Sequence, residues 1–516
     1  MMDNPSTTPS EPNMTPHLVS VTPFEELQNN ATLPPVASNT EGQEISAENN
    51  AIEEEENDTK GPPGKEAEDV PIQEGSIESV LDLLQKGKKI QNILIKRLNL
   101  QRKTFDQPVH FENCEFGQID LTRTTFQNTV TFSRCKFQRV NAHQTIFEKY
   151  ATISRCEFAY SATFKKNNFK DGIRFIANRV LCGITFNGSR FSRYSGASNK
   201  NPDANFSDNS YITQAQVNFH QCIFEGLVKH WGSVFEAWAE FKETVFQDIA
   251  DFRSVKFNEG VFFTGATFKK QALFRGSVFE LRTDFNECVF ENEMDFSKAK
   301  LRDFLYLQDA KWQGNDPKAG FRFHNMLVER MIVDRETLKD HLLSEKENNY
   351  METADEYAII RTNFERINRY DDEDWAYLKQ KQNQRRCLYK NSKNPWKKIR
   401  ELSEWLVLDL GCGYGTDPFR AIRSSLIVVC LFAILYFFTL QGILPPDQYA
   451  TVSSLNPVFK AAAAFNISLI VFTSGYADIK VVPEHWAGLF FPIEFMFGIV
   501  LIGLFVVSFS RKVIRS

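Results

Sequence analysis

Large apolar side chains recur every five or six residues through the middle of the chain. Between about residues 104 and 312 the recurring residue is mostly Phe, and a small side chain usually stands two positions earlier. The most regular run is Phe241, Phe246, Phe252, Phe257, Phe263, Phe268, Phe274, Phe279, Phe285, Phe290, Phe296 and Leu301. An amphipathic helix repeats every 3.6 residues and a half-buried strand every two, so neither explains this spacing. A fixed repeat instead predicts a solenoid, whose units bury their apolar side chains against one another.

The small residue before each recurring Phe is predicted to point into the same interior. Five of the nine cysteines occupy this position: Cys114, Cys135, Cys156, Cys222 and Cys288. The sequence has no CxxC pair and no Cys/His cluster, so it suggests neither a zinc site nor a disulfide framework. We interpret these cysteines as small apolar core residues.

This pattern resembles the pentapeptide-repeat family, whose motif centres on Leu or Phe with a small residue two positions earlier. The resemblance implies a right-handed, four-sided β-helix with one repeat on each side. Sides spaced alternately five and six residues apart make a coil of 22 residues, which places Phe241, Phe263 and Phe285 in one interior column. Successive coils should rise by about 4.8 Å, the spacing of paired strands. The polar stretch at 192–211 interrupts the rhythm and is expected to be a side loop.

The segments that flank the repeats have other compositions. Residues 1–75 are rich in Pro, Ser, Thr, Asn and Glu, which predicts a disordered acidic tail. Residues 76–103 are expected to form a helical lead-in. Residues 323–400 are predicted to be a helical hairpin that ends in a basic segment. The apolar stripe of its first helix is Tyr357, Ile360, Phe364 and Ile367.

Two apolar runs within residues 401–516 are long enough to cross a bilayer. They cover residues 421–443 and 486–509, and about 20 apolar residues span the hydrocarbon core. Nine Lys or Arg and no acidic residue lie within 379–400, and more basic residues follow the second run. The loop between the runs carries only two Lys. The positive-inside rule therefore predicts cytoplasmic termini and repeats, with the basic segment against lipid headgroups.

A short apolar helix lies between the two runs. Asn456 and Pro457 are typical of a helix start, and residues 458–472 are too short to span the membrane, as in a re-entrant helix. The order of span, short helix, polar loop and span, over residues 415–516, resembles the two-helix pore module of potassium channels. That family's filter reads Thr-x-Gly-Tyr-Gly-Asp. The corresponding residues here are Thr473, Ser474, Gly475, Tyr476, Ala477 and Asp478.

The resemblance implies that the backbone carbonyls of these loops, one from each of four chains, surround a permeant monovalent cation, potassium. Ala477 replaces the family's second glycine, and a Cβ there has a steric cost. The outermost ion site and the preference for potassium over sodium are therefore the features that this exchange should alter. Gly498 and Gly503 are candidate hinges of the last helix or points of helix contact. Glu494 is expected to face an aqueous cavity, as ionisable groups inside membranes usually do.

Residues 407–415 read Val-Leu-Asp-Leu-Gly-Cys-Gly-Tyr-Gly, which is similar to the cofactor loop of S-adenosylmethionine-dependent methyltransferases. That loop needs alternating strands and helices around it, whereas here a solenoid precedes it and apolar spans follow. We interpret the segment as interfacial, with Trp405, Tyr414 and Phe419 at headgroup depth. The sequence therefore predicts neither an enzyme nor a cofactor beyond the permeant ion.

Two functions are compatible with the sequence. The first is a homotetrameric cation channel, similar to a group of bacterial plasma-membrane proteins, in which the cytoplasmic repeats sense a signal or bind an unidentified partner. The second is a membrane-anchored interaction protein whose C-terminal helices serve only as an anchor. A net charge of −5 argues against a nucleic-acid partner.

Overall fold

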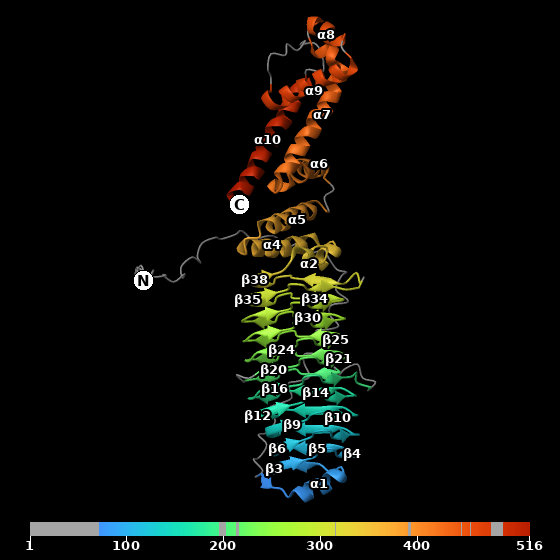
Figure 1. The fold of residues 1–516 in the computed structure, drawn as a ribbon, viewed down its shortest axis with the longest axis vertical. Coiled ribbons are helices and arrows are strands. Elements are labelled where there is room, and N and C mark those ends of the chain that lie inside the picture. Colours follow the sequence, from blue (N-terminus) through green and yellow to red (C-terminus); the bar gives the residue numbers. More distant parts are fainter. Residues whose placement is uncertain are drawn as a thin grey trace, which may run out of the picture. The chain divides into compact units, whose positions relative to one another are not determined.

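The computed structural model describes most of the chain from residue 72 onward. The described residues are 72–195, 203–212, 216–314, 316–390, 394–444, 446–454, 456–475 and 489–515. The predicted acidic tail at 1–75 lies almost wholly outside them, as does the middle of the interruption predicted at 192–211. Figure 1 shows short strands stacked coil upon coil from blue to yellow, followed by the helices α2 to α10.

Residues 90–332 form a β-solenoid of parallel strands. Its strands belong to three sheets of 17, 10 and 11 strands. The eleven-stranded sheet takes one strand from each coil in chain order, so the solenoid has about eleven turns. Phe105 pairs with Phe126, 21 residues later, whereas Val261 pairs with Thr283, 22 residues later. The predicted coil length is confirmed for the later coils, and the four-sided, right-handed form stays a prediction.

The strands are mostly two to seven residues long. The largest sheet holds β1 Gln73–Glu74, β3 Ile93–Asn99, β6 Glu115–Asp120, β9 Lys136–Asn141, β12 Glu157–Thr163, β15 Arg179–Val180, β16 Ile184–Thr185, β19 Ser210–Tyr211, β20 Val217–Asn218, β23 Val234–Phe235, β24 Ala239–Glu240, β27 Lys256–Phe257, β28 Val261–Phe262, β31 Val278–Phe279, β32 Thr283–Asp284, β35 Lys300–Tyr306 and β38 Leu327–Ile332. The eleven-stranded sheet holds β2 Ile90–Gln91, β5 Val109–Glu112, β8 Val130–Ser133, β11 Ala151–Ser154, β14 Ile173–Ile176, β18 Ala204–Asn205, β22 Val228–Lys229, β26 Ala250–Asp251, β30 Ala272–Leu273, β34 Glu293–Asp295 and β37 Gly320–Arg322. The ten-stranded sheet holds β4 Thr104–Phe105, β7 Thr125–Phe126, β10 Ile146–Phe147, β13 Asn168–Phe169, β17 Arg190–Phe191, β21 Ile223–Phe224, β25 Val245–Phe246, β29 Thr267–Phe268, β33 Val289–Phe290 and β36 Lys311–Trp312.

Stacked aromatic rings fill the interior of the solenoid. The ring centroids of Phe241 and Phe263 are 4.9 Å apart, and those of Phe263 and Phe285 are 4.7 Å apart, with the rings nearly parallel. All three side chains are fully buried. Rings of neighbouring columns meet edge to face, as Phe252 does with Phe263 at 5.4 Å. The ring spacing equals the strand spacing of about 4.8 Å, so the backbone ladder imposes the stack, and the predicted column is confirmed.

The small residues two positions before these rings also point inward. Cys114, Cys135, Cys156, Cys222 and Cys288 are buried, which confirms their interpretation as core residues. Burial raises the pKa of Cys222 to about 12, so its thiol is neutral at physiological pH. Where the position is Thr, the hydroxyl bonds to the backbone, as Thr244 donates to the carbonyl of Phe219 at 2.7 Å.

The predicted boundaries of the solenoid are wrong at both ends. The helical lead-in predicted for 76–103 is confined to α1 Ile77–Gln85, and the chain then enters the strands β2 and β3. Ile95 and Leu98 are buried in β3, which pairs along the open edge of β6. Pairing of that edge and burial of these side chains outweigh helix propensity. At the other end the strands continue past residue 312, through β38.

Helices make up the remainder of the described chain. They are α2 Arg335–Leu338, α3 Leu343–Lys346, α4 Tyr350–Arg366, α5 Tyr370–Tyr389, α6 Pro395–Glu404, a π-helix η1 Trp405–Leu410, a 3-10 helix η2 Gly413–Gly415, α7 Pro418–Ile443, α8 Pro446–Ser453, α9 Pro457–Ser474 and α10 Phe490–Arg515. The helices α4 and α5 pack on each other, which confirms the predicted hairpin. Its apolar stripe is buried at Tyr357, Ile360 and Phe364.

The helix α4 caps the last coil of the solenoid through its side chains. Glu356 accepts a hydrogen bond from the backbone N–H of Phe323 at 2.7 Å. Asn363 accepts from the N–H of Met331 at 2.6 Å and donates to its carbonyl at 2.8 Å. The edge of a sheet otherwise leaves such groups unpaired. The helical segment therefore ends the solenoid chemically as well as sterically.

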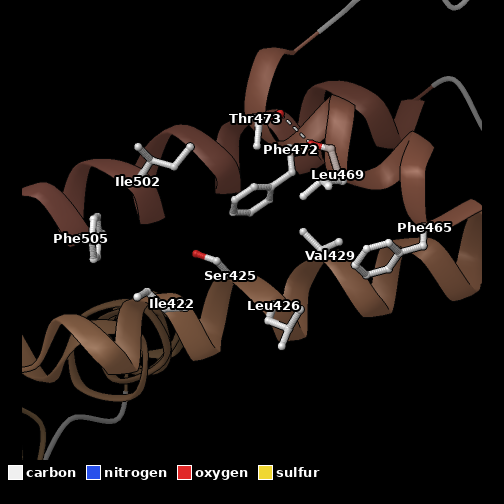
Figure 2. A pocket seen from close by; sticks show the side chains of 10 residues that line it. All are labelled: Ile422, Ser425, Leu426, Val429, Phe465, Leu469, Phe472, Thr473, Ile502 and Phe505. Atoms are coloured by element: carbon white, nitrogen blue, oxygen red, sulfur yellow. Dashed lines mark hydrogen bonds between the residues drawn. The ribbon is translucent and has the colours of Figure 1, made fainter. Parts of the chain in front are cut away.

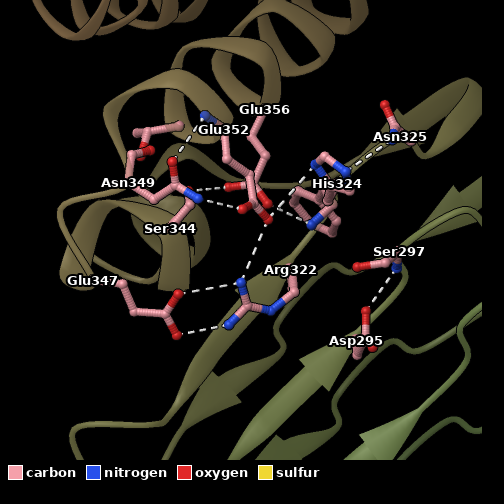
Figure 3. Close-up of polar contacts among 12 residues, drawn as sticks. Asp295, Ser297, Arg322, His324, Asn325, Ser344, Glu347, Asn349, Glu352 and Glu356 are labelled. Carbon is pink, nitrogen blue, oxygen red and sulfur yellow. Dashed lines mark hydrogen bonds and ion pairs between the residues drawn. The ribbon is translucent and has the colours of Figure 1, made fainter. Parts of the chain in front are cut away.

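Ion pairs reinforce this cap, as Figure 3 shows. Arg322 of β37 pairs with Glu347 at 2.7 Å, with Glu293 at 3.2 Å and with Glu352 at 3.4 Å. Glu356 lies behind them, where burial raises the pKa of its carboxyl to about 7. Three acidic side chains from the solenoid and the helical segment thus share one guanidinium.

Candidate membrane site

Three helices in the described part of the chain, α7, α9 and α10, are long and apolar enough to cross a membrane. The helices α7 and α10 correspond to the spans predicted at 421–443 and 486–509. Their surfaces carry many exposed large apolar side chains, of which Phe438 and Met496 are examples. Apolar surface of this extent is typical of contact with lipid or with other chains.

The helices α7 and α10 run antiparallel. At one end, which we call the base, a Cβ added to Gly415 would lie 3.9 Å from the hydroxyl of Ser508. At the other end, the far end, the ring centroids of Tyr436 and Phe491 are 5.3 Å apart. The chain thus reaches the far end through α7 and starts back from it in α10.

The helix α9 begins at the far end and ends beside the middle of both partners. Its first turn lines a groove of about 680 Å³ together with Ile434 and Phe438 of α7. Its last turns contact Val429 and Leu501, which form an apolar cluster with Phe472. The C-terminal end of α9 therefore lies partway between the base and the far end.

The structure places three of the six predicted filter residues at this C-terminal end. Thr473 and Ser474 belong to the last turn of α9, where their hydroxyls donate to the carbonyls of Leu469 and Ile470, each at 2.8 Å. Gly475 caps the helix with φ at 78°, a left-handed value that favours glycine. The other three, Tyr476, Ala477 and Asp478, lie outside the described residues.

An apolar groove of about 310 Å³ lies beside Thr473, between the three helices. Figure 2 shows its lining, in which Ser425 and Thr473 supply the only side-chain oxygens among ten residues. The hydroxyl of Thr473 bonds back to its own helix, as described above. Because apolar side chains offer a cation no ligands, this groove suits a lipid chain or a neighbouring apolar side chain instead.

Glu494 corrects one prediction from the sequence. Its side chain is fully buried between the three helices and does not face an aqueous cavity. Tyr436 of α7 donates its hydroxyl to Glu494 Oε2 at 2.6 Å, and Ser468 of α9 bonds to Oε1. Two polar partners on two other helices let a carboxyl remain inside an apolar bundle. The sequence showed the carboxyl but gave no sign of partners 58 and 26 residues away.

The two glycines predicted as hinges have different surroundings. A Cβ at Gly498 would collide with the backbone carbonyl oxygen of Phe472 in α9. A Cβ at Gly503 would meet nothing within 4 Å. Both lie inside α10, which runs without interruption. Gly498 is thus a point of close helix contact, whereas a hinge role for either residue stays a prediction.

The base of α10 contacts the hairpin that caps the solenoid. Arg511 pairs with Glu373 at 3.0 Å and with Asp374 at 2.8 Å, both in α5. Arg361 of α4 reaches the same Glu373 carboxylate at 2.8 Å. The carboxylate is fully buried, so its two arginine partners compensate its desolvation. Sequence reasoning missed this contact because it joins residues 138 positions apart.

The segment that is similar to a methyltransferase loop contains no strand. Residues 405–415 form the helices η1 and η2, and Asp409 pairs with Arg385 of α5 at 3.0 Å. Trp405 and Phe419 are exposed on either side of it. The helix α6 before it has no buried residue and exposes Trp396 next to basic side chains. Such a surface is typical of a helix at a membrane interface.

Comparison with known proteins identifies the repeats. A family model described as pentapeptide repeats, with nine copies, matches residues 111–157 and 241–289. No curated protein matches the chain. Both matched segments lie in the solenoid, and the helices follow it. The chain is therefore a pentapeptide-repeat solenoid followed by apolar helices, as fits a membrane-anchored repeat protein.

Proposed function

We propose that four copies of this chain form a cation channel in a bacterial plasma membrane, with potassium as the permeant ion. The repeats, as a right-handed four-sided β-helix in the cytoplasm, would receive the signal or bind the partner that regulates the pore. Lipid headgroups would contact the basic segment before α7. The helices α7 and α10 are the spans and α9 is the re-entrant helix of this proposal.

One observation carries the proposal: the chain enters the bundle through α9, stops partway and begins α10 again at the far end. Phe472, near the end of α9, lies against Gly498, whereas Phe491, at the start of α10, lies against Tyr436. The start of α10 is thus farther from the base than the end of α9. Such a path supports a re-entrant helix over a third span.

The end of α9 is also suited electrostatically to a cation. The last carbonyls of a helix carry a partial negative charge of about half an elementary unit, and α9 directs them toward the middle of the bundle. A single chain supplies too few carbonyls to replace the hydration shell of an ion, so the proposal requires a ring of copies. Exposed apolar faces such as that of Phe438 would then contact neighbouring copies or lipid.

A second candidate is a membrane-anchored interaction protein without conduction. Two observations favour it. The hydroxyl of Thr473 bonds to its own helix, and α9 has the length and composition of a span. In this alternative the solenoid binds a partner while α7, α9 and α10 hold it at the membrane.

Reconstitution of the full-length protein into liposomes tests the proposal. We expect potassium flux down a gradient, lost in Thr473→Ala and retained in Thr439→Ala. Thr439 is a matched control, because its hydroxyl also bonds back to its helix, to Leu435 at 2.9 Å, but at the far end of α7. Native mass spectrometry of the same preparation should give a tetramer.

Three results would count against a channel. A folded tetramer that passes no cation favours the anchored protein. A monomer or dimer in the membrane contradicts the ring. Equal flux in Thr473→Ala and the wild type places the ion path elsewhere.

A further inference from the structure

Two successive turns of α10 face two successive turns of α9. Glu494 lies opposite Ser468, and Gly498, one turn later, lies opposite Phe472, also one turn later. Residues four apart lie on the same face of a helix. The two contacts therefore set the depth of α9 along α10, immediately before Thr473 and Gly475.

The carboxyl of Glu494 joins all three apolar helices. It bonds to Tyr436 of α7 and to Ser468 of α9, and Ser468 also donates to the carbonyl of Val429 in α7 at 2.9 Å. A polar group without partners is costly in an apolar surrounding. The arrangement that gives each of these groups a partner is thus strongly favoured over one in which α9 has slid.

Gly498 excludes every side chain at the next turn. A Cβ there would collide with a backbone oxygen, which cannot rotate away as a flexible side chain can. Any substitution must therefore move the end of α9. Gly503, on the same helix, has no such neighbour and offers a matched comparison.

We propose that Glu494 and Gly498 are positioning residues that hold the end of α9, and the residues after it, at the depth that cation passage requires. The consequence for ions rests on the proposed channel function. The anchoring of α9 by itself can be measured without any flux.

Hydrogen exchange of the full-length protein in lipid nanodiscs tests the anchoring. Glu494→Leu keeps the volume and removes the hydrogen bonds, whereas Glu494→Gln keeps an acceptor for Tyr436 and a donor for Ser468. We expect exchange at residues 466–475 to rise by about tenfold in Glu494→Leu and to stay within about twofold of the wild type in Glu494→Gln. Gly498→Ala should raise it as well, and Gly503→Ala should leave it unchanged.

Two exchange results contradict the anchoring. Unchanged protection of α9 in Glu494→Leu shows that the carboxyl does not hold the helix. Equal exchange in Glu494→Gln and Glu494→Leu shows that hydrogen bonding by a neutral group does not suffice.

Reversal potentials of the reconstituted variants separate this inference from the channel itself. We expect the potassium-to-sodium permeability ratio to fall by about fivefold or more in Glu494→Leu, with rescue in Glu494→Gln. Loss of protection in Glu494→Leu together with a wild type that passes no cation contradicts the channel and supports the anchoring. Flux with an unchanged ratio in Glu494→Leu contradicts the positioning role and supports the channel.

Discussion

The solenoid and the apolar helices bury large side chains by opposite routes. In the solenoid each Phe meets the residue one coil away, so the partner of Phe263 is always 22 positions along the chain. In the helices the important contacts join unrelated positions, such as Tyr436 with Glu494. The solenoid satisfies its own interior, whereas the helices leave apolar faces such as that of Ile434 uncovered. A repeat thus carries its own partners, and the helical region needs a membrane or other chains to complete it.

The largest expected effect is the loss of a ring from the interior column. Phe263→Ala removes a fully buried ring that stacks on Phe241 and Phe285, which should lower the free energy of unfolding by about 3–5 kcal/mol. Denaturant unfolding followed by the circular dichroism of the strands measures it. A change of less than about 1 kcal/mol would show that neighbouring coils close the cavity.

A charged residue on an exposed apolar position should separate the two regions next. Ile434 of α7 is 58% exposed and Leu281 of the solenoid is 44% exposed. Ile434→Lys should cost about 3 kcal/mol of membrane-insertion free energy if that face meets lipid. Leu281→Lys faces water and should change stability by no more than about 0.5 kcal/mol. Insertion assays and unfolding of the two variants give the comparison, and similar small effects would argue against a lipid-facing α7.

The contact between the regions should depend on the buried ion pair and not on the exposed one. Arg511 reaches a fully buried carboxylate, whereas the neighbouring Lys512 pairs with the exposed Asp371. A double-mutant cycle of Arg511→Gln with Glu373→Gln should give a coupling of about 2 kcal/mol. The matched cycle of Lys512→Gln with Asp371→Asn should give about 0.5 kcal/mol or less. Equal couplings would contradict a specific link between α10 and the cap.

Two buried groups of the solenoid and its cap should respond to pH in opposite directions. His230 is stacked between Phe206 and Phe252, and among the described residues neither of its ring nitrogens has a hydrogen-bond partner. Burial lowers its pKa from 6.5 to about 3. The unfolded chain therefore binds a proton that the folded chain refuses, and stability falls as the pH falls below 6.5. The sign for Glu356 is the reverse: its pKa is raised from 4.5 to about 7, so the stability that it contributes is lost as the pH rises through that window.

The two slopes oppose each other between pH 4.5 and 6.5, each at about 1.4 kcal/mol per pH unit at most. Relative to the wild type, His230→Phe should gain stability as the pH falls, and Glu356→Gln should lose it. Thermal midpoints of the three proteins across this range measure the difference. Parallel pH profiles would mean that neither group is desolvated in the folded chain.

Sequence periodicity predicted the solenoid but not its limits. The Phe column at 241, 263 and 285 followed from spacing alone, because the partner of each coil is another copy of the same pattern. The strand Ile93–Asn99 was missed, since its apolar residues also suit a helix and only the open edge of β6 decides between them. The predicted hairpin was correct, yet nothing in its stripe indicated that Asn363 caps the backbone of Met331.

The candidate site shows the same division. The apolar runs, the short helix and the likeness of Thr473 and Gly475 to a filter come from composition and order along the chain. The burial of Glu494 and the close contact at Gly498 come from helices that meet side by side, and hydropathy contains no term for such contacts.

By itself the sequence determined the local periods: where strands coil, where helices are apolar and which small residues fit between rings. These properties depend on neighbours at a constant separation, so a linear pattern encodes them fully. Only the tertiary structure decided which helix faces touch, which carboxyl is enclosed and how α10 meets the solenoid cap. Those contacts join distant positions once each, and their free energy depends on desolvation and packing that exist only after the chain has folded.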